Sequence, residues 1–211
     1  MKKLLVKVCG MRDDANIRAV LALKPDFMGL ICYPKSPRYV GSEPTPGQSG
    51  CWAPVQKVGV FVNASLEEIA ARQRAFGFDC VQLHGGESAD ECRRVRQRTG
   101  CRVLKAVSVA CPDDVARAGD FAGAADYILF DTHTAGYGGS GRTFDWRWLD
   151  VYAADIPFFI SGGLDIDALR LIKRAAWPRL AGVDLNSRFE LSPGLKDIER
   201  LKDVFDLLRE Q

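Results

Sequence analysis

A cysteine and a lysine stand two residues apart at the end of the first predicted strand. Cys9 follows the apolar segment 4–8, and Gly10 comes directly after it. Side chains alternate along a strand, so Lys7 and Cys9 should point to the same side. A nearby ammonium favours the thiolate, the form of cysteine that accepts a proton. Cys9 is therefore a candidate general base, with an inert buried cysteine as the alternative, and Asp184 is a candidate partner for Lys7.

A carboxylic acid ends another apolar segment. Asp131 follows residues 127–130 and precedes a glycine-rich loop. Partial burial at such a position would raise the pKa of the carboxyl group, as a general acid requires. Asp131 is therefore a candidate general acid, and the alternative is an aspartate that only caps a helix or braces the loop.

Three further polar side chains follow predicted strands and are candidates for ligand contacts. Arg38 lies in the loop 33–39, which two prolines stiffen. A guanidinium held in this way can bind a carboxylate through two parallel hydrogen bonds. Gln82 and His84 share one face at the end of the fourth predicted strand and would line the mouth of a site. A solvated or structural role is the alternative for all three residues.

Glycines and small polar residues follow the last two predicted strands. Ser161, Gly162 and Gly163 end the seventh strand, and Asn186 and Ser187 end the eighth. Glycine lets a phosphate approach backbone N–H groups closely, and the N-terminus of a following helix favours an anion. We expect a phosphate site here, with a simple tight turn as the alternative for the glycine pair.

The loop 134–143 nearly fits the nucleotide-binding pattern GxxxxGK[ST], but Arg142 replaces its lysine. Arginine is not a simple substitute for that lysine, and 144–146 interrupt the expected helix. This disfavours an NTPase. The loop, with Gly139 and Gly141, could still donate N–H groups to a phosphate or close over a substrate.

The elements that must position these residues alternate regularly between strand and helix. Short apolar strands separated by helices indicate a parallel sheet that is covered on its outer face. Eight such units without a second core predict one (β/α)₈ TIM barrel domain over residues 1–211, compact beside the usual size of about 250 residues. The alternative is an open doubly wound sheet. The predicted strands are 4–8, 27–32, 57–62, 80–83, 103–109, 127–130, 157–160 and 182–185.

Helix starts are signalled by Asp13 or Asp14, Ser65, Ser88 and Asp165. A short helix is expected from Pro112 and a Trp-rich one from Asp145. The last helix should carry Leu195, Ile198, Leu201, Val204 and Leu208 on one face. Residues 41–54 hold three prolines and three glycines, so we expect a degraded second helix there.

Composition excludes several classes of function. The formal net charge is only +2 and the basic residues are dispersed, which argues against a nucleic-acid partner. No apolar run approaches the roughly 20 residues that span a bilayer, so no membrane partner is expected. Seven cysteines without CxxC spacing disfavour a disulfide framework or a zinc site and suit a reducing cytoplasm. A homodimer is one assembly that the sequence allows.

Seven segments, in order along the chain, carry a specific combination of motifs. They are KVCGM (7–11), YPKSPRYV (33–40), VGVFVN (58–63), VQLHG (81–85), FDT…GGSGRTFDW (130–146), SGGL (161–164) and VDLNS…PGLKD (183–197). Together they resemble the phosphoribosylanthranilate isomerase family of tryptophan biosynthesis. That family is a cofactor-independent (β/α)₈ barrel. It converts N-(5-phosphoribosyl)anthranilate to 1-(2-carboxyphenylamino)-1-deoxyribulose 5-phosphate by an Amadori rearrangement.

The resemblance implies that Cys9 is the general base, that Asp131 is the general acid and that Arg38 binds the anthranilate carboxylate. Phosphate would lie on the glycine-rich loop and on the turns after strands seven and eight. Two departures stand out: Arg188 replaces a glycine common in the family, and 41–54 lacks the usual second helix. The alternatives are the related histidine-pathway isomerase, which has aspartate in place of Cys9, and a non-catalytic sugar-phosphate-binding barrel.

Overall fold

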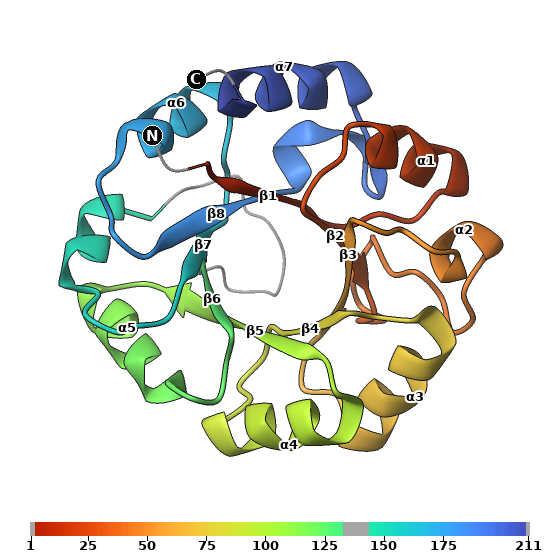
Figure 1. The fold of residues 1–211 in the computed structure, drawn as a ribbon, viewed down its shortest axis with the longest axis horizontal. Helices are drawn as coiled ribbons and strands as arrows, with labels where there is room; N and C mark the ends of the chain where they lie inside the picture. The colour runs from red at the N-terminus through yellow and green to blue at the C-terminus, as the bar shows by residue number, and fades with distance from the viewer. Residues whose placement is uncertain (1–2, 133–143, 210–211) are drawn as a thin grey trace.

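The computed structural model describes residues 3–132 and 144–209. Within these ranges, eight parallel strands close into a barrel in the order β1 to β8, and helices surround it (Figure 1). The predicted (β/α)₈ fold is confirmed, and the open-sheet alternative is wrong because β1 pairs with β8. The strands are β1 Leu5–Val8, β2 Phe27–Ile31, β3 Gln56–Phe61, β4 Cys80–Leu83, β5 Arg102–Val109, β6 Tyr127–Thr132, β7 Phe158–Ile160 and β8 Leu180–Leu185.

The helices begin where the sequence predicts them. The side chains of Asp13, Ser65, Ser88 and Asp165 each accept a hydrogen bond from a backbone N–H in the first turn of a helix. The helices are α1 Asp14–Ala22, α2 Pro46–Ser49, α3 Leu66–Phe76, α4 Ala89–Thr99, α5 Pro112–Arg117, α6 Ile166–Arg174 and α7 Ile198–Arg209, with 3₁₀ helices η1 Ala118–Phe121, η2 Trp146–Val151 and η3 Ser187–Phe189. None of the helices in the described ranges is long and apolar enough to cross a membrane.

The second helix is degraded, as expected. Only the four residues of α2 are helical between β2 and β3, and Thr45 caps them. Trp52 fills the space that a longer helix would cover: it is buried, and its indole N–H donates to the carbonyl of Gly47 at 2.8 Å.

The predicted short Trp-rich helix from Asp145 is present as the 3₁₀ helix η2. Another prediction about helices was wrong. Leu195 does not lie on the last helix: it belongs to a small antiparallel hairpin formed by β9 Glu190–Ser192 and β10 Leu195–Lys196. Helical spacing to Ile198 suggested otherwise, but a turn with Gly194 at φ +87° precedes Leu195, and α7 begins only at Ile198.

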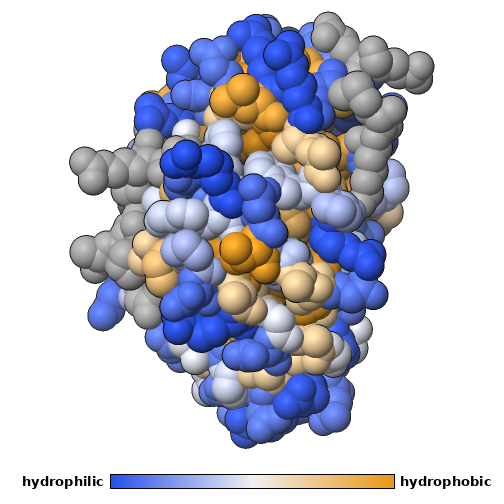
Figure 2. Space-filling view, turned by 90° about the vertical axis from the view of Figure 1, so that its left-hand side faces the viewer, coloured by the Kyte–Doolittle hydropathy of each residue, from blue (hydrophilic) through white to orange (hydrophobic). Residues whose placement is uncertain are grey.

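Two apolar layers hold the barrel together. One lies between the strands and the helices, and the other fills the barrel interior. In the interior, the rings of Phe27, Tyr127 and Phe159 pack edge to face with centroids 5.4–5.9 Å apart. The outer helix faces are polar: on the side of the barrel that Figure 2 shows, hydrophilic residues predominate and hydrophobic patches are separate. In barrels of this kind the active site lies at the carboxyl ends of the strands.

Candidate active site

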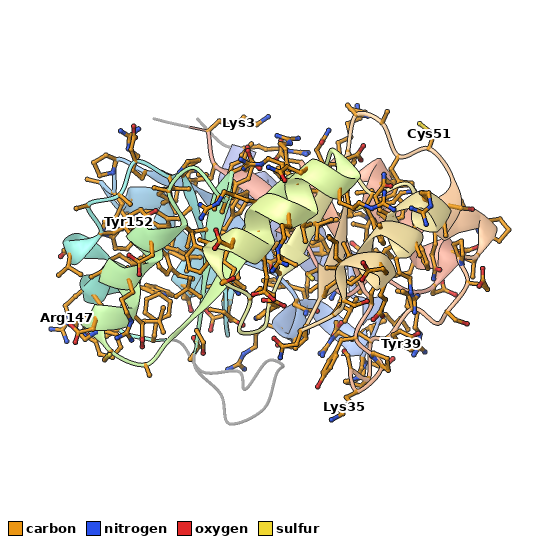
Figure 3. The ribbon with its side chains drawn as sticks, turned by 90° about the horizontal axis from the view of Figure 1, so that it is seen from below. Lys3, Lys35, Tyr39, Cys51, Arg147 and Tyr152 are labelled. Carbon is orange, nitrogen blue, oxygen red and sulfur yellow. The ribbon has the colours of Figure 1, made fainter. Side chains whose placement is uncertain are left out.

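A pocket opens at the carboxyl ends of the strands and brings most of the predicted site residues together. In Figure 3, Lys35 and Tyr39 lie at this end of the molecule, and Lys3 and Cys51 lie at the opposite end. The pocket encloses about 780 Å³, part of it open to solvent. The predicted residues that line it are Cys9, Arg38, Gln82, His84, Asp131, Ser161, Gly162, Gly163, Asn186 and Ser187. Gly139 and Gly141 lie outside the described residues.

Cys9 follows β1 and is held by its backbone. Its N–H donates to the carbonyl of Leu185 at 2.9 Å, and its side chain is buried in the barrel interior. A Cβ atom on Gly29 of β2 would lie 2.7 Å from the Cys9 sulfur, so glycine at that position makes room for the thiol. The sulfur therefore has a fixed place against β2.

The charges beside Cys9 agree with the sequence prediction for Lys7. Lys7 points the same way as Cys9, and its Nζ forms an ion pair with Oδ1 of Asp184, the predicted candidate partner, at 2.9 Å. Burial lowers the pKa of Lys7, but Asp184 and Cys9 outweigh it, so its pKa is raised. Burial raises the pKa of the Cys9 thiol, and the opposing effects of Lys7 and Lys196 do not reverse this. The resting residue is a thiol because burial outweighs the neighbouring ammonium groups.

Asp131 lies within β6, one residue beyond the predicted strand end. Its side chain is 19% exposed, and Oδ2 lies 3.2 Å from Nε2 of His84. Nδ1 of His84 lies 2.9 Å from Nε2 of Gln82. The structure thus joins three predicted site residues from two strands into one row on the pocket wall. Such a row can fix the direction of the Asp131 carboxyl group.

The turns after β7 and β8 are adjacent because these strands pair. Gly162 and Gly163 have φ +87° and +65°, which a side chain would strain. A Cβ on Gly162 would also lie 2.8 Å from Oδ1 of Asp131. Asn186 differs from the expectation of a free ligand group, since its Oδ1 accepts a hydrogen bond from Nζ of Lys196 at 2.7 Å.

Arg38 lines the pocket, but part of its guanidinium already has a partner. Its Nε lies 2.9 Å from Oε1 and 3.0 Å from Oε2 of Glu190, and its Nη2 lies 2.6 Å from Oε2. The sequence predicted that Arg38 binds a substrate carboxylate, and this stays a prediction. In the structure the partner of Arg38 is the carboxylate of Glu190 in the β9–β10 hairpin.

The chain matches known proteins over nearly its whole length. Residues 6–207 match the family described as N-(5'phosphoribosyl)anthranilate (PRA) isomerase. The N-(5'-phosphoribosyl)anthranilate isomerase of Parabacteroides distasonis is 43% identical over 203 residues, which cover 95% of this chain and 91% of that protein.

This chain belongs to the phosphoribosylanthranilate isomerase family.

Solved structures of the isomerase family share the fold. The crystal structure of phosphoribosyl anthranilate isomerase from Thermus thermophilus superposes with a TM-score of 0.83 at 25% identity and covers 97% of this chain and 98% of its own. A phosphoribosyl anthranilate isomerase in complex with reduced 1-(o-carboxyphenylamino)-1-deoxyribulose 5-phosphate has a TM-score of 0.78 at 29% identity, covering 96% and 97%. Membership favours this isomerase over the histidine-pathway, non-catalytic and NTPase alternatives.

Three residues that contact the lining of this isomerase-family pocket, without lining it themselves, were not predicted from the sequence. Gly29 interrupts an apolar strand, and such a glycine is a known sign of close approach. Lys196 is part of the matching segment PGLKD, but the spacing of its neighbours suggested a helix. Glu190 carries no local signal, because its role depends on Arg38, which is 152 residues away in the chain.

Proposed function

We propose that this protein converts N-(5-phosphoribosyl)anthranilate to 1-(2-carboxyphenylamino)-1-deoxyribulose 5-phosphate, as its family does in tryptophan biosynthesis. The observation that carries the proposal is that Cys9 and Asp131, a possible base and a possible acid, line one pocket with Arg38. The adjacent turns after β7 and β8 line the same pocket. The substrate requires all these parts: two proton-transfer groups, an anion site for its carboxylate and another for its phosphate.

In the proposed mechanism, Asp131 donates its proton to the ring oxygen of the ribose. The C1–O bond breaks, the ring opens, and the aniline nitrogen forms a protonated Schiff base with C1. The Cys9 thiol releases its proton to solvent, and the thiolate then removes the proton from C2. The C2–H electron pair forms the C1–C2 double bond of an enolamine, and the electron pair of the C1–N double bond moves to nitrogen. Tautomerisation, with a proton added at C1 and one lost from the C2 hydroxyl, gives the ketone. All electrons stay within the substrate, so we propose that the reaction needs no cofactor.

The other predicted residues would hold the substrate. The N–H groups of Gly162 and Gly163 and the side chain of Ser161, with Asn186 and Ser187, would surround the phosphate, because the N–H of Ser161 already donates to the carbonyl of Phe130. The N-terminus of α6 Ile166–Arg174 lies after this turn and favours an anion. Gly139 and Gly141 stay a prediction for the same phosphate. Arg38 would bind the anthranilate carboxylate. Gln82 and His84 would contact the opened sugar near Asp131.

The test is turnover by purified protein, measured by the change in anthranilate fluorescence, with and without a chelator. We expect turnover in both cases. Cys9→Ala or Asp131→Ala should lower kcat at least about 100-fold, because a proton-transfer group contributes about 10²–10⁴ in rate. Circular dichroism should show that both variants stay folded. Near-normal turnover by either variant would remove that residue from its proposed role, and an inactive wild-type protein would refute the function.

We also propose a cytoplasmic location and leave the homodimer as a prediction. All seven cysteines are free thiols, and five of them are buried, as a reducing compartment allows. Analytical ultracentrifugation at micromolar concentration would decide between a monomer and a dimer.

A further inference from the structure

Four polar residues form a connected cluster beside the pocket, which we name the Arg38 cluster: Arg38, Glu190, Lys196 and Asn186. Glu190 is at its centre. One side of its carboxylate contacts Arg38, and its Oε1 also lies 2.7 Å from Nζ of Lys196. The same Nζ donates to Oδ1 of Asn186 at 2.7 Å.

The cluster is buried and anchored. The side chains of Lys196, Glu190 and Arg38 are 0%, 4% and 11% exposed. The backbone of Lys196 is fixed to α1: its N–H donates to Oδ1 of Asn16 at 2.8 Å, and its carbonyl accepts from Nδ2 of Asn16 at 2.9 Å. Glu190 is thereby held by a lysine whose own position is fixed twice.

The charges within the cluster do not balance. Burial raises the pKa of the Glu190 carboxyl, but the contacts with Arg38 and Lys196 outweigh it and bring the pKa below its ordinary value. Burial also lowers the pKa of Lys196, although its contact with Glu190 opposes this. With Glu190 ionised and Arg38 and Lys196 both protonated, the four residues carry one surplus positive charge. A buried surplus charge is costly unless an opposite charge is near. The side of the cluster that faces the pocket is where such an anion can enter.

Glu190 occupies only one of the two hydrogen-bonding edges of the guanidinium. It takes the edge formed by Nε and Nη2, and no described residue accepts a hydrogen bond from the edge formed by Nη1 and the second N–H of Nη2. The stem of Arg38 lies close against Gly10. A Cβ atom added to Gly10 would be 2.7 Å from Cδ of Arg38 and 2.7 Å from Oδ1 of Asn186, so glycine leaves just enough room for the stem. With one edge and the stem fixed, the remaining edge has a defined direction.

We propose that Glu190 and Lys196 are positioning residues that hold the free edge of Arg38 ready for the carboxylate of an aryl-amine substrate. Glu190 sets the angle of the guanidinium, and Lys196 holds Glu190. The surplus charge makes the site selective for a substrate with a carboxylate over the same substrate without one. This inference rests on the proposed function, since it deepens the role of Arg38 there.

The test compares two inhibitors on each variant: the reduced product and its analogue with hydrogen in place of the ring carboxylate. The readout is the inhibition constant of the analogue divided by that of the reduced product. This ratio reports recognition of the carboxylate alone, and it is high when the site recognises the carboxylate. Glu190→Gln removes the anion that fixes the guanidinium and also adds one net positive charge to the cluster. The ratio should still fall about tenfold, because the inhibitor carboxylate loses a correctly directed hydrogen bond to a charged group, which is worth a factor of ten or more. For the substrate, KM should rise more than kcat falls. In an Arg38→Met background, Glu190→Gln should change the ratio no further.

A matched control is available on the other side of the barrel. Glu87 is also a buried carboxylate paired with a buried lysine, Lys105, at 2.9 Å. Glu87→Gln should lower the free energy of unfolding as Glu190→Gln does, but it should leave the inhibitor ratio unchanged. If Glu190→Gln leaves the ratio unchanged too, Glu190 is only structural and the proposal is overturned.

Two further measurements keep the outcome decisive. If Glu190→Gln does not fold, Lys196→Met replaces it. The ratio should again fall, because Glu190 loses its anchor and the surplus charge is gone. An unchanged ratio overturns the proposal.

The wild-type turnover assay separates the proposed function from the positioning role. A wild type without turnover refutes the proposed function, whereas turnover with an unchanged ratio in the variants refutes only the positioning role.

Discussion

At the scale of single residues, the space around the Cys9 sulfur matters as much as its charge. The thiol is buried and protonated at rest, so it reaches the thiolate form only transiently. Its usefulness as a base then depends on where the sulfur lies relative to the substrate. Gly29, on the neighbouring strand, is the residue that leaves this place open.

Gly29→Ala should therefore lower kcat. The new methyl group would lie 2.7 Å from the sulfur, so Cys9 must move. We expect a loss of about 10- to 100-fold, because a displacement near 1 Å can cost a factor of 10². Steady-state kinetics measures it, with Gly119→Ala as control, whose methyl would meet nothing closer than 3.6 Å. Equal kcat in both variants would show that Gly29 does not position the thiol.

At the scale of elements, the β9–β10 hairpin is a small insertion with a large effect on the site. It lies between η3 and α7 and carries both Glu190 and Lys196. Its turn needs glycine, since Gly194 has φ +87°, and the Gly194 N–H donates to Oε1 of Glu190 at 3.1 Å. The conformation of this turn thus affects the position of Glu190, and through Glu190 that of Arg38.

Gly194→Ala should weaken both folding and substrate binding. A side chain in the left-handed region costs about 1–2 kcal/mol, and the shifted turn should raise KM through Glu190. Gly100→Ala is the control: Gly100 has φ +70° at the end of α4, with nothing within 4 Å of an added Cβ. Urea denaturation should show similar losses of stability for both variants. A KM that rises equally in both would contradict the link between hairpin and site.

At the scale of the whole molecule, one buried ion pair joins the first strand to the last. Lys7 and Asp184 are 177 residues apart in the chain and stand directly opposite in the β1–β8 register. Their side chains are 0% and 5% exposed, so neither charge has water as an alternative partner. The ion pair therefore lies between β1 and β8, the two strands whose pairing closes the barrel.

Lys7→Met should destabilise the barrel by about 3–5 kcal/mol, because it leaves a buried carboxylate unpaired. The double variant Lys7→Met with Asp184→Leu should regain part of that loss, because no charge then remains in the interior. Denaturant titration of the single and double variants measures the coupling free energy. Additive losses would mean that the two residues contribute to closure independently.

Patterns in the amino-acid sequence were enough to predict the architecture and most of the residues that line the pocket. The alternation of apolar strands with capped helices predicted the barrel, and the ends of those strands identified ten of the pocket residues, because parallel strands must end at one face. The shared direction of Lys7 and Cys9 also followed, since side-chain alternation is a local property of the backbone.

The groups that restrain the catalytic candidates could be identified only from the folded chain. Glu190 beside Arg38, Gly29 beneath Cys9 and burial outweighing Lys7 at the thiol all depend on strand register and on how a hairpin folds over the barrel mouth. Such contacts join residues distant in the chain, and local periodicity carries no information about them. The protonation of a buried group likewise depends on everything packed around it.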